Sequence, residues 1–205
     1  MKNVLIACEE SQVECRAWLL AKTNAFSCDI QPCSGGMPER HVQGDALRLI
    51  APPVTFRTCD GKKHHVKKWD LIIAHPPCTY LTAAAGAFTY KGGVLDSDRY
   101  QKGVEAREFF MRFWEADCEH IAIENPRPFR VWGLPKPTTQ LHPYEFGAPW
   151  SKRTYLWLKG LPPLMPTIYA PRFKSWVYST RGSFKRSKSF TEVAMAMAAQ
   201  WKEFL

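Results

Sequence analysis

Runs of apolar residues separated by polar turns predict most of the strands of this chain. A buried strand reads as a continuous apolar run of roughly four to eight residues that ends at turn-forming residues. Such runs predict strands at residues 3–7, 25–30, 69–74, 120–124 and 154–158. The third run contains Leu71–Ala74 and ends at His75-Pro76-Pro77. Because proline cannot donate to a strand ladder, the chain turns out of the sheet directly before Cys78.

Apolar residues at helical spacing predict helices between these strands. The first helix is expected from Ser11 to about Lys22, where Ser11 and Glu14 have the spacing of a capping box. The second is expected over residues 97–118 and the last over residues 191–205. Residues 3–29 thus form a strand-helix-strand unit with the length of a βαβ crossover. This order of elements predicts an α/β fold, with a doubly wound and mostly parallel sheet, in a single domain over residues 1–205.

The remaining segments are predicted to be loops and one hairpin. Residues 31–43 are rich in proline and glycine, which favours a loop. Residues 54–68 are basic and turn at Asp60-Gly61, which is typical of a β-hairpin. Residues 83–93 are small and include glycines, so we expect a loop that closes as a lid over a site. Cys59, His64 and His65 lie close together in the hairpin, but their spacing fits no standard zinc pattern and we expect no metal site.

Composition narrows the class of protein. A chain of 205 residues with 45% hydrophobic residues can build one sizeable core. No apolar run approaches the ~20 residues of a membrane span. The N-terminal apolar run is too short for a signal peptide. We therefore expect a cytoplasmic protein without a membrane partner, whose seven cysteines are reduced thiols rather than disulfides.

The charge of the chain indicates a polyanionic partner. The formal net charge is +9, and such a balance favours nucleic acid. Residues 165–190 form a short segment of basic and aromatic side chains, which can hold phosphates and stack on bases. We expect nucleic-acid contacts from Arg172, Lys174, Trp176, Arg181, Lys185, Arg186 and Lys188. The alternative is a basic loop over the core with ordinary buried aromatics.

Polar residues that suit a reaction follow several of the predicted strands. Cys78 follows one strand, Glu124-Asn125-Pro126 follows another, and Asp29 and Asp45 follow two earlier segments. Because the carboxyl ends of parallel strands lie at one edge of a sheet, we expect these residues to share that edge. The alternative for Cys78 is a packed cysteine after a Pro-Pro turn.

At these positions the chain resembles the cytosine-5 DNA methyltransferases. The segment DLIIAHPPCT is similar to the nucleophile motif of that family, and IAIENP is similar to its Glu-Asn motif. The segment FGAPWSKRTYLWL resembles a later motif in which proline precedes basic residues and a strand. The matches run in the family's order through nearly the whole chain. The resemblance implies a Rossmann-like fold, S-adenosylmethionine as cofactor, and transfer of a methyl group to carbon 5 of cytosine in DNA.

The resemblance also implies roles for residues. Cys78 would attack carbon 6 of cytosine, and Lys152 and Arg153 would lower the pKa of its thiol. Glu124, kept partly protonated, would hydrogen-bond ring nitrogen 3, and Asn125 would fix that loop. The cofactor contacts that it implies are Ala7, Cys8, Glu9, Asp29, Ile30, Asp45, Ala46, Ala74 and Pro76.

The sequence departs from the family pattern in three places. The first motif of the family is glycine-rich, whereas residues 7–12 here contain no glycine, and Thr79 stands where the family has glutamine. The family also inserts a target-recognition domain, whereas about thirty residues separate Leu158 from Thr191. We therefore expect the chain to recognise a short site, to act on single strands, or to need a partner chain for specificity. The compact size suits a phage enzyme that works in a bacterial or phage-infected cell.

Other functions remain open at this point. One is a methyltransferase-like protein that binds nucleic acid as a regulator without catalysis. Another is a methyltransferase that acts on RNA or on a free nucleotide. The Pro-Pro loop also resembles that of amino-methyltransferases, but an aromatic residue normally follows there, so Cys78 favours cytosine-5 chemistry.

Overall fold

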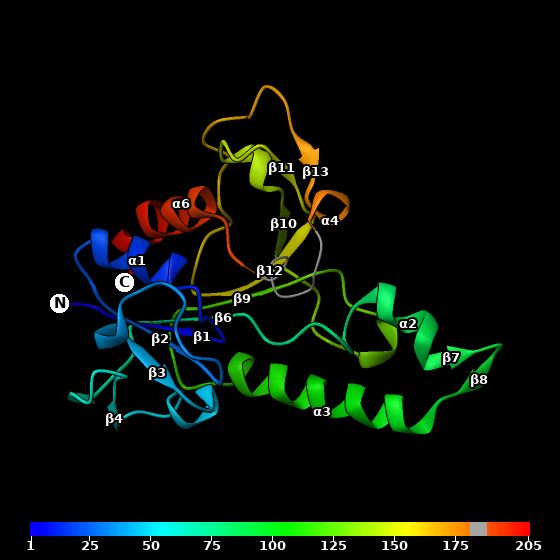
Figure 1. The fold of residues 1–205 in the computed structure, drawn as a ribbon, viewed down its shortest axis with the longest axis horizontal. Coiled ribbons are helices and arrows are strands. Elements are labelled where there is room, and N and C mark those ends of the chain that lie inside the picture. Colours follow the sequence, from blue (N-terminus) through cyan, green and yellow to red (C-terminus); the bar gives the residue numbers. More distant parts are fainter. Residues whose placement is uncertain (181–187) are drawn as a thin grey trace.

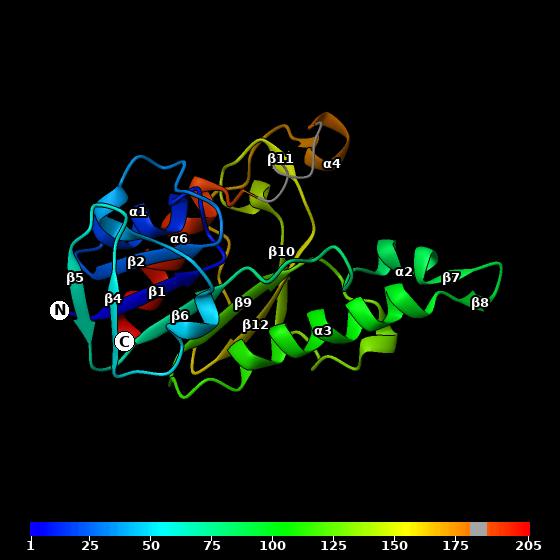
Figure 2. The same ribbon diagram turned by 60° about the horizontal axis from the view of Figure 1, so that its bottom comes forward.

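The computed structural model describes residues 1–180 and 188–205. Within these ranges the centre of the fold is a seven-stranded sheet with the order β10-β12-β9-β6-β1-β2-β3 (Figure 1, Figure 2). Its strands are β1 (Asn3–Ala7), β2 (Asn24–Asp29), β3 (His41–Gln43), β6 (Leu71–Ala74), β9 (Ile121–Asn125), β10 (Thr139–Leu141) and β12 (Thr154–Lys159). The strands from β3 to β9 are parallel, and β12 runs antiparallel to both β9 and β10. The predicted Rossmann-like α/β fold with a mostly parallel sheet is therefore confirmed.

Helices cover both faces of this sheet. Helices α1 (Val13–Leu20) and α6 (Thr191–Trp201) pack together on one face, and α3 (Ser97–Trp114) covers the other (Figure 1). Successive side chains of a strand point to opposite faces. Ile6 therefore joins the core beneath α1 and α6, while Leu5 joins the core beneath α3. Strands that are buried on both faces read as continuous apolar runs, which is why the sequence located them.

Helix α1 begins differently from the prediction, and the capping box expected at Ser11 is wrong. The helix starts after Gln12, whose φ of 57° lies in the left-handed region. Its first turn is closed by Glu9, whose carboxylate accepts hydrogen bonds from the backbone N of Glu14 (2.7 Å) and of Cys15 (3.2 Å). Oxygen acceptors at this position satisfy open N–H groups of the first turn.

The segment predicted to be a lid loop is also different. Residues 83–95 form α2 (Ala83–Thr89) and a small hairpin of β7 (Tyr90–Lys91) and β8 (Val94–Leu95). Alanine has the highest helix propensity, and the hydroxyl of Thr82 accepts a hydrogen bond from the backbone N of Ala85 at 3.1 Å. The prediction of a loop is therefore wrong, because the alanines outweigh the glycine that follows them.

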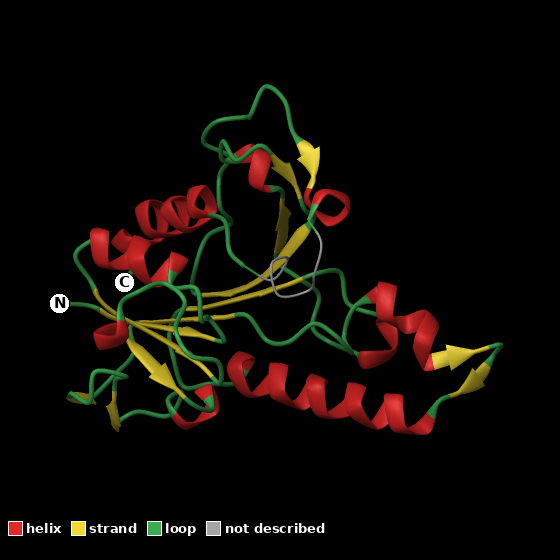
Figure 3. Cartoon of the chain, in the orientation of Figure 1, coloured by secondary structure: helices red, strands yellow, loops and turns green. Residues whose placement is uncertain are grey.

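Figure 3 shows which parts of the chain form helices, strands and loops. The other predicted elements differ from the structure mainly at their ends. The hairpin is confirmed as β4 (Val54–Arg57) and β5 (Lys63–Val66), and α3 ends at Trp114 rather than at residue 118. Strand β3 falls within the segment predicted to be a loop. The short elements are η1 (Pro38–Arg40), η2 (Ala46–Arg48), η3 (Arg130–Trp132), η4 (Pro143–Glu145), β11 (Trp150–Ser151), β13 (Lys174–Ser175), α4 (Trp176–Ser179) and η5 (Lys202–Phe204). Across residues 1–180 and 188–205 we find no helix with the length and hydropathy that crossing a membrane requires.

Gly103 allows α3 to lie against the indole of Trp132 in η3. A Cβ at this position would overlap the Trp132 ring. Gly103→Ala should therefore displace the indole, although alanine is the better helix former. We expect the free energy of unfolding, measured by urea denaturation, to fall by about 1–3 kcal/mol.

Gly44→Ala is the matched control, because a Cβ at Gly44 meets no atom within 4 Å. It should leave the free energy of unfolding within about 0.5 kcal/mol of the wild-type value. Equal effects of the two substitutions would contradict the assigned close contact.

Candidate active site

The carboxyl ends of β6 and β9 lie side by side, and both carry polar residues that the sequence singled out. Strand β6 leads directly into His75-Pro76-Pro77-Cys78, while Glu124 and Asn125 are the last two residues of β9. Because β12 is antiparallel to β9, its amino end, next to Lys152 and Arg153, lies at the same edge. The structure thus brings the residues predicted to act in the reaction to one edge of the sheet.

Asn125 fastens the loop that carries Cys78. Its buried side-chain amide donates a hydrogen bond from Nδ2 to the backbone O of Pro76 at 2.8 Å. The backbone O of Cys78 accepts hydrogen bonds from the backbone N of Leu81 (3.1 Å) and of Thr82 (3.2 Å). Cys78 is half-buried and lies on a closed turn. The position of this turn depends on Asn125 at the end of β9.

The loops that follow β6 and β9 are also joined to each other. The backbone N of Ala83 donates to the backbone O of Arg127 at 2.9 Å. The backbone N of Phe129 donates to the backbone O of Leu81 at 2.7 Å. These bonds hold the loop that carries the cysteine against the loop that follows Glu124.

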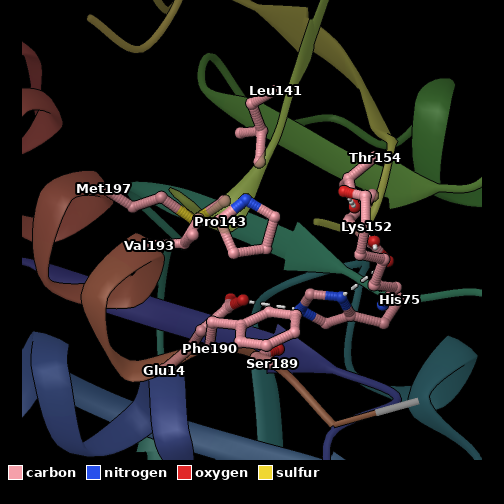
Figure 4. Close-up of a pocket in the computed structure, with 11 residues that line it drawn as sticks. Glu14, His75, Leu141, Pro143, Lys152, Thr154, Ser189, Phe190, Val193 and Met197 are labelled. Carbon is pink, nitrogen blue, oxygen red and sulfur yellow. Dashed lines mark hydrogen bonds and ion pairs between the residues drawn. The ribbon is translucent and has the colours of Figure 1, made fainter. Parts of the chain in front are cut away.

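Glu124 belongs to a line of four charged side chains, the charged line, formed in order by Lys152, Glu124, His75 and Glu14. Its Oε1 is 3.7 Å from Nζ of Lys152, and its Oε2 is 3.4 Å from Nδ1 of His75. The other ring nitrogen of His75, Nε2, is 3.1 Å from Oε2 of Glu14 on α1. Only 11% of the His75 side chain and 2% of the Glu14 side chain are exposed. Figure 4 shows the Glu14 carboxylate and the His75 ring facing each other, with a dashed line between them.

These contacts set the charge of both groups. Burial alone would raise the pKa of Glu124, but the charges of Lys152 and His75 and a hydrogen bond with Thr154 outweigh burial and lower this pKa to about 2. Burial alone would lower the pKa of His75, but Glu14 and Glu124 outweigh it and raise this pKa well above its ordinary value. Near neutral pH Glu124 is a carboxylate and His75 an imidazolium ion. The prediction of a partly protonated Glu124 is therefore wrong for the protein without substrate.

The predicted influence of Lys152 and Arg153 on Cys78 stays a prediction. Lys152 directs its ammonium group at Glu124 and lies over the ring of Phe190, with Nζ 5.9 Å from the ring centroid. Arg153 is exposed. The charge of Lys152 therefore acts first on the carboxylate of Glu124.

A cavity of about 20 Å³ adjoins the charged line (Figure 4). Its lining residues are Glu14, His75, Glu124, Leu141, Pro143, Lys152, Thr154, Ser189, Phe190, Val193 and Met197. This volume has room for about one water molecule. A larger group could enter here only if the lining residues moved apart.

The residues predicted to hold the nucleoside end of a cofactor surround the ends of β1 and β2. Cys8 has a φ of 61°, a conformation that favours glycine, so the backbone turns here without one. Burial, and then the charges of Asp29, Cys28 and Asp45, raise the pKa of the Cys8 thiol, which places both carboxylates near it. Ile30 is 71% exposed. Carboxylate acceptors beside an exposed apolar side chain fit the hydroxyls and the flat base of a nucleoside, and Ala46 is buried next to Asp45.

Four other predicted cofactor residues are buried or hydrogen-bonded within the protein, namely Ala7, Glu9, Ala74 and Pro76. Both the backbone N and the side chain of Glu9 have partners within the protein. Its backbone N donates to the backbone O of Cys28 at 3.2 Å, and its carboxylate closes the first turn of α1. Burial, and then the charge of Glu14, raise the pKa of Glu9 to about 8. Cofactor contacts from these four residues stay predictions.

Trp176, which was predicted to contact nucleic acid, packs within the protein. Its ring meets Trp150 and Phe190 edge to face, with centroids 4.8 Å and 5.1 Å apart. The neighbouring Tyr178 is 92% exposed. Tyr178 is therefore better placed than Trp176 to stack on a base.

The predicted basic residues have different surroundings. Arg172 and Lys174 are exposed. Lys188 instead lies 3.7 Å from Oε1 of Glu10 and donates a hydrogen bond to Oγ of Ser34 at 3.2 Å. The predicted contacts at Arg181, Lys185 and Arg186 lie outside the described residues.

Sequence reasoning missed His75 and Glu14 as members of the site. His75 counted only as the residue before the Pro-Pro turn, and Glu14 only as the partner of Ser11 in a cap. The available signal was a histidine at the carboxyl end of a buried strand, where ionisable side chains gather. Among the described residues, no group of three or more histidine, cysteine, aspartate or glutamate side chains is arranged to hold a metal ion.

Comparison with known proteins finds similarity at the level of structure. No protein-family profile and no curated protein sequence matches this chain. One similar solved structure is a prophage-encoded protein of Escherichia coli assigned as a DNA modification methyltransferase, with 16% identity, a TM-score of 0.49, and 84% of this chain and 53% of that one covered. The Entamoeba histolytica methyltransferase EhMeth has 15% identity, a TM-score of 0.43, and 85% and 57% covered. A triple mutant of Spodoptera frugiperda DNMT2 has 15% identity, a TM-score of 0.40, and 86% and 56% covered.

This chain therefore spans little more than half the length of each of these structures. Likeness at such low identity concerns the fold alone.

Removing the charge of Lys152 should weaken the protein most at neutral pH. The pKa of Glu124 falls from an ordinary 4.5 to about 2 on folding, so its contribution to stability is complete above pH 4.5 and is lost as the pH falls toward 2. That shift corresponds to about 3 kcal/mol. We expect Lys152→Met to lower the free energy of unfolding at pH 7 by about 3 kcal/mol. Urea denaturation at pH 7 and pH 3 should show a smaller deficit at pH 3.

Lys2→Met is the matched control, because Lys2 pairs with Asp70 at 3.6 Å but its own side chain is 50% exposed. Its cost should stay below about 1 kcal/mol. A deficit of Lys152→Met that is the same at both pH values would show that Lys152 does not set the charge of Glu124.

Proposed function

We propose that this protein is an S-adenosylmethionine-dependent methyltransferase that methylates carbon 5 of cytosine in DNA through a covalent adduct with Cys78. One observation carries the proposal: the hydrogen bond from Asn125 to Pro76 fastens the Cys78 loop to the strand that holds Glu124. A cysteine and a carboxylate on adjacent strand ends suit nucleophilic addition to a ring whose nitrogen takes up a proton.

Cys78 acts as the nucleophile. Its thiolate forms a bond from Sγ to carbon 6, and the ring electrons move so that nitrogen 3 takes a proton and carbon 5 becomes nucleophilic. S-adenosylmethionine, when bound, supplies the electrophilic methyl group. The carbon 5 proton then passes to water and nitrogen 3 gives its proton back, which breaks the bond from Sγ to carbon 6 and restores the thiolate.

The nucleoside end of the cofactor would be held at the ends of β1 and β2. Asp29 suits the ribose hydroxyls, and Asp45 suits the adenine amino group, because both offer carboxylate acceptors. The exposed Ile30 offers an apolar contact to the adenine ring. The left-handed turn at Cys8 lets the backbone approach the cofactor without a glycine.

Charge and exposure support DNA as the substrate. The net charge of +9 favours a polyanion, and the exposed Arg172 and Lys174 can contact phosphates. In duplex DNA the target base has to leave the stack before it can reach Cys78. The small cavity beside Glu124 then has to widen as the base enters.

A nucleic-acid-binding regulator without catalysis is the second candidate. It is favoured by Glu9, whose backbone N and carboxylate are engaged within the protein rather than available to the methionine end of a cofactor. Calorimetry with S-adenosylmethionine separates the two functions. The enzyme binds the cofactor, whereas a regulator of this kind produces no heat of binding.

Cys78→Ala should abolish methyl transfer, because the proposed mechanism forms the bond to carbon 6 through Sγ of Cys78. We expect the wild-type protein to yield 5-methylcytosine in digested host DNA, measured by mass spectrometry. It should also form a complex with a 5-fluorocytosine oligonucleotide that survives a denaturing gel, and Cys78→Ala should form none. Cys59→Ala, at an exposed cysteine, is the control and should retain both signals. Full activity of Cys78→Ala would refute the mechanism.

Arg172→Ala and Lys174→Ala should each weaken binding to an oligonucleotide of any sequence. Loss of one phosphate contact lowers the slope of log affinity against log salt concentration by about 0.9. Fluorescence anisotropy across a salt series measures this slope. Lys62→Ala is the control, because Lys62 pairs with Asp60 at 3.2 Å in the β4–β5 hairpin, and it should leave the slope unchanged. Equal slopes for all four proteins would remove these two residues from the interface.

A further inference from the structure

We propose that His75 supplies the proton that Glu124 passes to ring nitrogen 3 of cytosine, and that Glu14 holds His75 in position for this transfer. The proposal rests on the proposed cytosine-5 chemistry and adds a proton donor behind the carboxylate. His75 acts through Glu124 and does not itself touch the substrate.

The geometry places His75 between two carboxylates. Its Nδ1 faces Oε2 of Glu124 at 3.4 Å, and its Nε2 faces Oε2 of Glu14 at 3.1 Å. The three groups come from the end of β9, the loop after β6 and the first turn of α1. Their low exposure keeps bulk water away from the two contacts. The ring therefore has one nitrogen for each carboxylate.

Glu124 is poorly suited to supply the proton alone. With a pKa of about 2 it is a carboxylate at neutral pH, and a carboxylate can accept a proton but has none to donate. An imidazolium ion carries two N–H groups. His75 can release the proton on Nδ1 toward Glu124 while Nε2 still faces Glu14.

The charged groups around His75 come from several elements. Glu14 faces it from α1 and Glu124 from β9, while Lys152 lies behind Glu124. Glu9 is also close to His75, and the charge of His75 lowers the pKa of Glu9. Burial and the charge of Glu14 raise the pKa of Glu9 by more. The two cations, His75 and Lys152, thus lie next to the carboxylates of Glu14 and Glu124. This balance keeps His75 protonated before the reaction begins.

The proton is returned within each turnover. As Sγ of Cys78 bonds to carbon 6, the proton on Nδ1 of His75 moves to Glu124, and Glu124 passes a proton to nitrogen 3. His75 is then neutral, and Glu124 is again a carboxylate. When the bond from Sγ to carbon 6 breaks, nitrogen 3 gives its proton back through Glu124 to Nδ1. The carbon 5 proton goes separately to water.

His75→Asn tests the transfer, because the asparagine amide can donate a hydrogen bond to Glu124 but cannot release a proton at neutral pH. The assay is release of tritium from carbon 5 of a cytosine oligonucleotide, with and without S-adenosylmethionine. We expect the rate at pH 8 to fall about a hundredfold. The deficit should shrink toward pH 6, because protons from solvent replace those from His75. Oligonucleotide affinity should change less than the rate.

A second variant keeps the test valid if His75→Asn does not fold. Glu14→Gln keeps a polar partner for His75 but removes a negative charge, so the pH above which the wild-type rate declines should move down by about one unit. Glu105→Gln, at an exposed position of α3, should leave the pH profile unchanged.

The outcomes separate this inference from the proposed function. If the wild-type protein releases no tritium and forms no Cys78 adduct, both are overturned. If the wild type is active but His75→Asn matches it at every pH, only the role of His75 is overturned. A deficit of equal size at pH 6 and pH 8 would assign His75 a structural role alone and also overturn the inference.

Discussion

The buried carboxylate of Glu124 is the constraint on which the rest of the site depends. Taking a carboxylate out of water costs several kcal/mol unless cations and hydrogen bonds replace its hydration. Here the cations are His75 after β6 and Lys152 before β12, while Glu14 on α1 faces the other side of His75. Because the charges of Lys152 and His75 help to outweigh the burial of Glu124, the charged line joins these segments at the edge of the sheet.

Much of the fold could be predicted from the sequence, because the information for it is local. Apolar runs form the strands β1, β2, β6, β9 and β12. Because these strands are buried on both faces, few polar residues interrupt the runs. The shared edge of Cys78 and Glu124 followed from the parallel order of the strands that precede them. Neither prediction needed to know which side chains touch across the sheet.

Features that depend on contacts between distant residues could not be predicted in this way. Glu9 closes α1 from before the usual cap position. Trp176 packs against Trp150 and Phe190, although Lys174 and Tyr178, two residues away on either side, are exposed. The charge of Glu124 depends on two cations that pattern analysis treats as unrelated. In each case the sequence shows the residue type, while only the three-dimensional arrangement shows its partner.

The backbone hydrogen bonds between the loops after β6 and β9 couple the conformations of these two loops. The bonds from Ala83 to Arg127 and from Phe129 to Leu81 join segments that are separated in the chain by all of α3. Because the donors and acceptors are backbone groups, the junction depends on the conformation of the two loops and not on their side chains. A substitution that changes the backbone path of one loop would therefore also displace the other.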